Sequence, residues 1–68
     1  MNHIEVRLNG EPTRIAPMTL AEFVASLDQE PTALATVVNG RFVPRDARSA
    51  RVLAQGDEVM TFKPIVGG

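Results

Sequence analysis

Residues 18–27 read MTLAEFVASL and carry the clearest local signals in the chain. Thr19 and Glu22 have the spacing of a capping box, and Met18 and Phe23 have the spacing of a hydrophobic staple, so both pairs predict a helix that begins at Thr19. An apolar stripe follows at helical spacing, made of Leu20, Phe23, Val24 and Leu27. We therefore expect one main helix, ending near Asp28, that packs this stripe against a sheet.

A first hairpin is expected ahead of the helix. Residues 3–8 alternate between polar and apolar side chains, which is the period of a half-buried strand. Asn9 and Gly10 follow directly and tolerate the positive φ angles of a tight turn. Glu11 and Pro12 indicate a somewhat longer or bulged connection, after which the chain returns over residues 13–15.

A second hairpin is expected after the helix. Residues 34–38 and 41–43 read as its strands, and Asn39 with Gly40 reads as its two-residue turn. Residues 45–54 are polar without a sustained period and are interpreted as a crossing loop, with Val52 and Leu53 as an apolar anchor. Ala47, Ala50 and Arg51 would tolerate a helical turn within it.

A last strand is expected over residues 58–63, which makes the chain α+β. If this strand pairs with the first and the helix lies diagonally over one sheet face, the result is a ubiquitin-like β-grasp. That fold has a mixed sheet of four to five strands with one main helix across one face.

The burial pattern of the last strand has two solutions. Met60 and Phe62 are its larger apolar side chains, but turning them inward places Val59 on the solvent face. If Val59 and Thr61 face the helix instead, Met60 and Phe62 form an exposed apolar patch. We favour this second solution, because an exposed patch of this kind marks a partner surface.

Composition limits the chemistry available to the 68 residues. Cysteine is absent and His3 is the single histidine, which argues against disulfides, metal sites and histidine-based triads. Seven basic residues against eight acidic ones, without a basic run, argue against nucleic acid as a partner. No signal segment or membrane-length apolar stretch is visible, so we expect a cytoplasmic protein. We expect no catalytic or metal-binding residues, and hence no enzyme.

The sequence ends in Gly67 and Gly68. Glycine has no Cβ and can thread a slot that is too narrow for a side chain. The α-carboxylate of Gly68 is ionised at neutral pH and reacts poorly with nucleophiles until it is activated. We expect a domain over residues 1–63 and a flexible tail over residues 64–68 that delivers this carboxylate to another enzyme.

Three strings stand out when the chain is read as a whole. They are VVNGRFVPR at residues 37–45, GDEV at 56–59 and GG at 67–68. Together they resemble the ThiS family, the sulfur carriers of thiamine biosynthesis. The first string is the most specific, whereas the other two also occur in the small subunit of molybdopterin synthase.

The resemblance implies a β-grasp protein that is a substrate and not a catalyst. An E1-like adenylating enzyme, ThiF in this family, would use ATP to convert the Gly68 carboxylate to an acyl adenylate. Sulfur from a cysteine desulfurase or sulfurtransferase would then displace AMP and leave a thiocarboxylate. Thiazole synthase, ThiG, would receive that sulfur, and the chain itself would bind no cofactor.

The resemblance also assigns roles to individual residues. Gly68 would carry the thiocarboxylate, and the tail residues that enter a partner's channel would be Gly67, Val66 and Ile65. Met60 and Phe62 would belong to the partner interface.

Three other functions are compatible with the same tail and sheet. The chain could carry sulfur for another pathway, such as molybdopterin synthesis. A ubiquitin-like protein modifier would instead join Gly68 to lysines of other proteins. A plain binding module would use the sheet surface alone.

Overall fold

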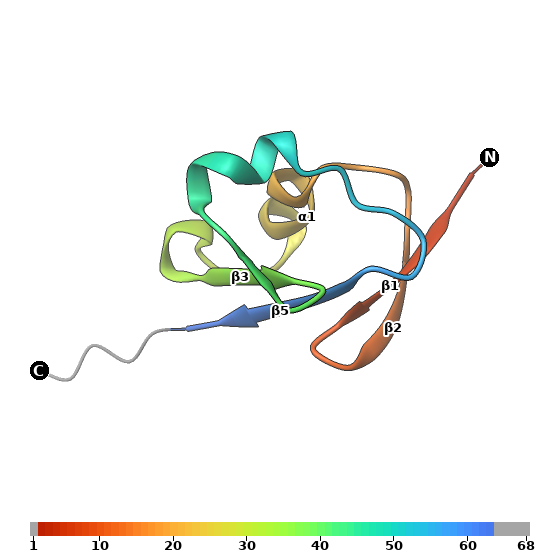
Figure 1. Ribbon diagram of the computed structural model, residues 1–68, viewed down its shortest axis with the longest axis horizontal. Helices are drawn as coiled ribbons and strands as arrows, with labels where there is room; N and C mark the ends of the chain where they lie inside the picture. The colour runs from red at the N-terminus through yellow and green to blue at the C-terminus, as the bar shows by residue number, and fades with distance from the viewer. Residues whose placement is uncertain (1, 64–68) are drawn as a thin grey trace, which may run out of the picture.

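The computed structural model describes residues 2–63 as a five-stranded sheet with helical segments covering one face (Figure 1). The strands are β1 (Ile4–Leu8), β2 (Glu11–Ile15), β3 (Ala35–Val38), β4 (Arg41–Val43) and β5 (Glu58–Phe62). One α-helix, α1 (Leu20–Ser26), follows the first hairpin, and two 3-10 helices are present, η1 (Pro31–Ala33) and η2 (Arg45–Ala50).

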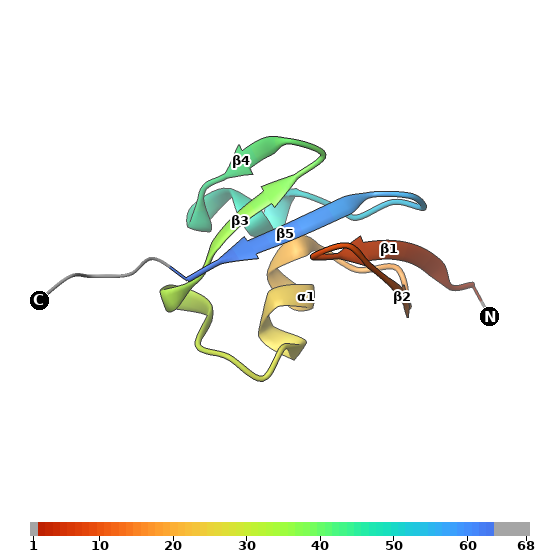
Figure 2. The ribbon, with the colours of Figure 1, turned by 90° about the horizontal axis from the view of Figure 1, so that it is seen from below.

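The strands lie in the order β2-β1-β5-β3-β4, so the last strand in the chain is the central one (Figure 2). Val59 of β5 lies opposite Leu8 in a parallel pairing with β1 and opposite Val38 in an antiparallel pairing with β3. The sheet is therefore mixed. This is the ubiquitin-like β-grasp that the sequence predicts, including the pairing of the last strand with the first.

The start of α1 is confirmed. The hydroxyl of Thr19 accepts a hydrogen bond from the N–H of Glu22 at 3.2 Å, and the Glu22 carboxylate accepts one from the N–H of Thr19 at 2.9 Å. The second bond, together with one from the Thr19 hydroxyl, holds the pKa of Glu22 below its ordinary value. Local sequence thus fixes where the helix begins, and it ends at Ser26, close to the predicted Asp28.

The predicted stripe of α1 forms one side of the core. Leu20 and Val24 have no exposed surface, Phe23 is also buried, and Leu27 packs at the margin. The sheet, the end of η1 and the loop before β5 supply the other side through Val6, Leu34, Val38, Val43, Leu53 and Val59. The alternation of buried and exposed residues along β5 follows from this packing.

Both Asn-Gly turns adopt the conformation that their sequence favours. Asn9 has φ of 52° and Gly10 of 90°, while Asn39 has φ of 52° and Gly40 of 81°. Asparagine and glycine are the residues that tolerate this left-handed region best, so both turns are the tight two-residue type.

The predicted longer connection in the first hairpin is wrong. Leu8 lies directly opposite Glu11, so β2 begins immediately after the two-residue turn and includes Pro12, opposite Arg7. Because β2 is an edge strand, proline at this position deprives no second neighbour of a hydrogen bond. The edge position follows from the tertiary arrangement and is not visible in the local sequence.

The interpretation of residues 45–54 as a crossing loop is also corrected. Its first part is the 3-10 helix η2, and Arg48 on that helix is only 4% exposed. Leu53 is buried as expected, but Val52 is 60% exposed, so only one of the two residues anchors the segment.

Arg48 is buried because three acceptors surround its guanidinium group. Its Nε donates to the hydroxyl of Thr36 at 3.0 Å, its Nη1 to the carbonyl of Pro31 at 3.1 Å, and its Nη2 to the carbonyl of Leu34. Thr36 in turn donates to the carbonyl of Val43 at 2.9 Å. Burial of the guanidinium, with a contribution from the nearby charge of Arg45, lowers the pKa of Arg48. This side chain therefore connects η2 to η1 and to the β3-β4 hairpin.

The division into a domain over residues 1–63 and a tail over residues 64–68 stays a prediction, because the tail lies outside the described residues. Within residues 2–63, no helix has the length and apolarity needed to cross a bilayer.

Candidate functional site on the open face of the sheet

The face of the sheet opposite α1 carries the apolar side chains that the sequence assigns to a partner interface. Met60 is 38% exposed and Phe62 is 48% exposed, whereas Val59 beside them has no exposed surface. The favoured solution for the last strand is therefore confirmed. That these two residues contact a partner stays a prediction.

Neighbouring strands extend this pair into a larger surface. Val37 of β3 lies opposite both Met60 of β5 and Phe42 of β4, and Ala35 lies opposite Phe62. Directly opposite residues share a face, so these five side chains form one group. At 64% exposure, Phe42 is the most exposed large apolar side chain in the part of the chain described. We call Ala35, Val37, Phe42, Met60 and Phe62 the open-face patch.

Sequence reasoning missed the contribution of Phe42 to this surface. The signal was available, because Phe42 and Val43 are adjacent in a strand, and adjacent side chains of a strand point to opposite faces of the sheet.

The other half of this face is charged. Arg7 on β1 lies opposite Glu58 on β5, and Glu5 on β1 lies opposite Arg14 on β2. All four side chains are exposed. The open-face patch thus ends at a border of alternating charges, as apolar interaction sites on soluble proteins commonly do.

The end of β5 is held by the side chain of Asn9. Its Oδ1 accepts from the N–H of Thr61 at 2.9 Å, and its Nδ2 donates to the Thr61 hydroxyl at 3.1 Å. The pairing of β1 with β5 stops at Val59, so Asn9 continues the hydrogen bonding where the backbone ladder ends. We call this contact the Asn9 clasp.

Asn39 holds the start of β5 in the same way. Its Oδ1 accepts from the N–H of Glu58 at 2.9 Å, and its Nδ2 donates to Asp57 Oδ1 at 2.9 Å. The predicted role of Asn39 as a turn residue is confirmed, and its side chain has this additional contact.

Asp57 is the buried centre of this corner. Its Oδ2 accepts from the N–H of Ala54 at 2.8 Å and lies 3.3 Å from Nη2 of Arg51. Burial alone would raise the pKa of Asp57, but the hydrogen bonds from Asn39 and Ala54 and the charge of Arg51 outweigh it, and the pKa is lowered.

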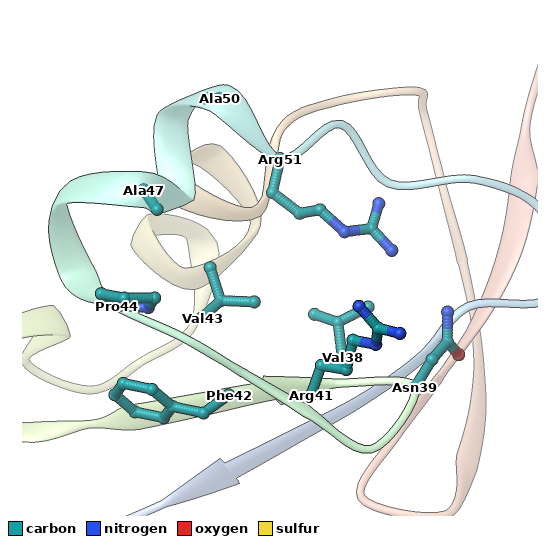
Figure 3. A pocket seen from close by; sticks show the side chains of 9 residues that line it. All are labelled: Val38, Asn39, Arg41, Phe42, Val43, Pro44, Ala47, Ala50 and Arg51. Atoms are coloured by element: carbon teal, nitrogen blue, oxygen red, sulfur yellow. The ribbon is translucent and has the colours of Figure 1, made fainter.

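A hollow of about 560 Å³ lies between β4 and η2. We call it the β4 hollow. Figure 3 shows the side chains that line it, which are those of Val38, Asn39, Arg41, Phe42, Val43, Pro44, Ala47, Ala50 and Arg51. The sequence did not predict this hollow, because its walls come from two segments whose packing depends on the tertiary fold.

The predicted tail residues lie outside the described residues, namely Ile65, Val66, Gly67 and Gly68. Over residues 2–63, the side chains that commonly bind metals do not gather in a group of three or more. The described part of the site is therefore the open-face patch and the strand that leads to residue 64.

A family model described as the ThiS family matches residues 6–68, which include the final Gly-Gly. The chain belongs to the ThiS family. A ThiS relative in Escherichia coli (strain K12), named sulfur carrier protein ThiS, is 32% identical over 53 residues, which cover 78% of this chain and 80% of the relative.

Two solved structures from Geobacter metallireducens share the fold. A crystal structure of the thiamine biosynthesis protein ThiS superposes with a TM-score of 0.85 at 22% identity and covers 96% of this chain and 100% of that one. A solution structure described as a thiamine biosynthesis protein gives a TM-score of 0.76 at 22% identity, covering 96% of this chain and 88% of that one.

Proposed function

We propose that this ThiS-family sulfur carrier of thiamine biosynthesis carries its sulfur as a thiocarboxylate on Gly68. The observation that carries the proposal is the family match, which runs to the end of the Gly-Gly sequence. The protein acts as a substrate for its partners, and the reactive groups belong to them.

The chemistry requires two steps at one carboxyl group. A carboxylate oxygen of Gly68 attacks the α-phosphorus of ATP, which releases pyrophosphate and gives an acyl adenylate. A sulfur nucleophile then attacks the carboxyl carbon, and AMP departs with that oxygen. Hydrosulfide gives the thiocarboxylate directly, whereas a persulfide gives an acyl disulfide that a thiol must cleave. An E1-like adenylating enzyme supplies the first step, and thiazole synthase receives the sulfur.

The open-face patch supports this proposal because it gives the partners a surface to recognise. Phe62 precedes Gly68 by six residues, and an extended chain of that length spans about 20 Å. The adenylation site of a partner that covers the patch must therefore lie within about that distance. Gly67 and Gly68 would occupy the narrow end of the partner's channel, with Ile65 and Val66 behind them.

The test is the intact mass of the protein after incubation with ATP, the adenylating enzyme and sulfide. The expected result is a gain equal to the exchange of one oxygen for one sulfur. A chain that lacks Gly68 is the control and should keep its mass. A second arm transfers the product to thiazole synthase and measures whether sulfur leaves the protein.

An unchanged mass with an adenylating enzyme that is active on a known carrier would contradict the proposal. Lysine-linked conjugates that depend on Gly68 would instead indicate a protein modifier. A loaded protein that gives its sulfur to molybdopterin synthase and not to thiazole synthase would indicate the other sulfur pathway.

A further inference from the structure

The β4 hollow has two chemically different ends. Val43, Pro44 and Ala47 form an apolar end, while Arg41 and Arg51 point their guanidinium groups toward the other end, beside Asn39 (Figure 3). Among residues 2–63, these two arginines are the only charged residues that line the hollow, and both are basic. The shape and charge suit an anionic group that is attached to an apolar one.

The two arginines differ in the ion pairs and hydrogen bonds that their guanidinium groups make. Arg51 is 3.3 Å from the carboxylate of Asp57 and also donates to the carbonyl of Val52. Arg41 makes no side-chain hydrogen bond or ion pair with any residue in the range 2–63. Its guanidinium group is therefore not paired with a carboxylate of the described residues, and its planar fork matches one.

Phe42 connects the hollow to the open-face patch. It belongs to the patch through its place opposite Val37, and it also lines the hollow. β4 is an edge strand of the sheet, so a surface that covers the patch continues around this edge without crossing another strand. The two features are therefore parts of one continuous surface.

The β4 hollow is the apolar area that borders the open-face patch, because the β1-β2 side of the face is charged. A partner that covers the patch can therefore extend its contact onto the hollow.

We propose that the β4 hollow is a second contact area for the adenylating enzyme, where a carboxylate of the enzyme binds Arg41 and an adjacent apolar side chain packs on Val43 and Ala47. The inference rests on the proposed function, because it concerns the recognition of the same carrier. Arg51 is a weaker contributor, since Asp57 already occupies one side of its guanidinium group.

The first test compares two charge reversals at exposed arginines. Arg41→Glu places a negative charge at the hollow, while Arg14→Glu makes the same change in net charge on β2, at the opposite edge of the sheet. We expect Arg41→Glu to raise the KM of adenylation for the carrier by about tenfold or more with kcat unchanged, because the variant repels a carboxylate. Arg14→Glu should stay within about twofold of the wild type.

A second test fills the hollow without a change in charge. Ala50→Phe places a ring in the hollow, and Ala25→Phe places the same ring on an exposed position of α1. Ala50→Phe should raise KM several-fold and keep the salt dependence of the wild type, whereas Arg41→Gln should raise KM and weaken that salt dependence. Circular dichroism checks that every variant is folded.

The outcomes separate the inference from the proposed function. Wild-type protein that is never adenylated would overturn the proposed function itself. If the wild type is adenylated and Arg41→Glu behaves like Arg14→Glu, the second contact area is wrong. The second contact area is also wrong if Ala50→Phe leaves KM unchanged, because a filled hollow would then not hinder the enzyme and no side chain of the enzyme would enter it.

Discussion

Replacing Arg48 by methionine should remove the main connection between η2 and the rest of the fold. Methionine keeps an apolar stem of similar length, so the packing along the side chain is largely retained. The three hydrogen bonds to Thr36, Pro31 and Leu34 are lost. The effect on stability should therefore come from acceptors that lose their donor.

The magnitude follows from which acceptors are buried. The bonds to Thr36 and Leu34 are buried, whereas the bond to Pro31 is only partly buried. An unsatisfied buried acceptor costs about 1–3 kcal/mol, and removal of the buried charge offsets part of this loss. We expect a net loss of about 3 kcal/mol in the free energy of unfolding. For a domain of this size that loss lowers Tm by about 12–24 °C.

The assay is thermal and urea unfolding followed by far-ultraviolet circular dichroism, because the chain has neither tryptophan nor tyrosine for fluorescence. Arg45→Met is the control, since Arg45 is exposed on the same 3-10 helix. It should change stability by no more than about 0.5 kcal/mol. Arg48→Lys should fall between the two, because an ammonium group cannot hold three acceptors in the guanidinium geometry. Equal stability of Arg48→Met and Arg45→Met would refute this reasoning.

Three further predictions concern β5 and its surroundings. Asn9→Gly keeps the left-handed turn but removes the Asn9 clasp, so it should lower the free energy of unfolding by about 1–2 kcal/mol. It should also speed hydrogen exchange at the Thr61 amide, and an unchanged exchange rate would argue against the clasp. The lowered pKa of Asp57 stabilises the fold above the ordinary value of 3.8, and this stability is lost as pH falls below it. In Asp57→Asn, the free energy of unfolding should therefore fall less steeply as the pH is lowered. An equally steep fall would show that other carboxyl groups cause the loss of stability in acid. Phe62→Ser should cost about 1–2 kcal/mol of stability, because about half of the ring is buried, and should raise the KM of adenylation of the folded protein. An unchanged KM would remove Phe62 from the interface.

The elements that sequence reasoning predicts well are those that depend on neighbours in the chain. The capping box at Thr19 and Glu22 and the two Asn-Gly turns involve contacts within three residues, so the local pattern contains them. The exposure of Met60 and Phe62 follows from alternation along one strand, once Val59 is assigned to the core.

The features that sequence reasoning misses depend on residues that are distant in the chain. Arg48 stands in a polar segment and looks like a surface residue, because its acceptors are 12 to 17 positions away. The place of Pro12 in a strand requires β2 to be a sheet edge, and the exposure of Phe42 requires its face of the sheet to be left uncovered by the helices. The β4 hollow likewise exists only once η2 packs beside β4.

The central position of β5 has a consequence for how the protein is made. The two hairpins leave the ribosome first, and isolated two-stranded hairpins are marginally stable at best. They become one sheet only when β5 emerges and inserts between β1 and β3. A product truncated before β5 therefore cannot complete the sheet and stays unfolded. It then cannot bind the partners in competition with the complete protein, and proteases can degrade it.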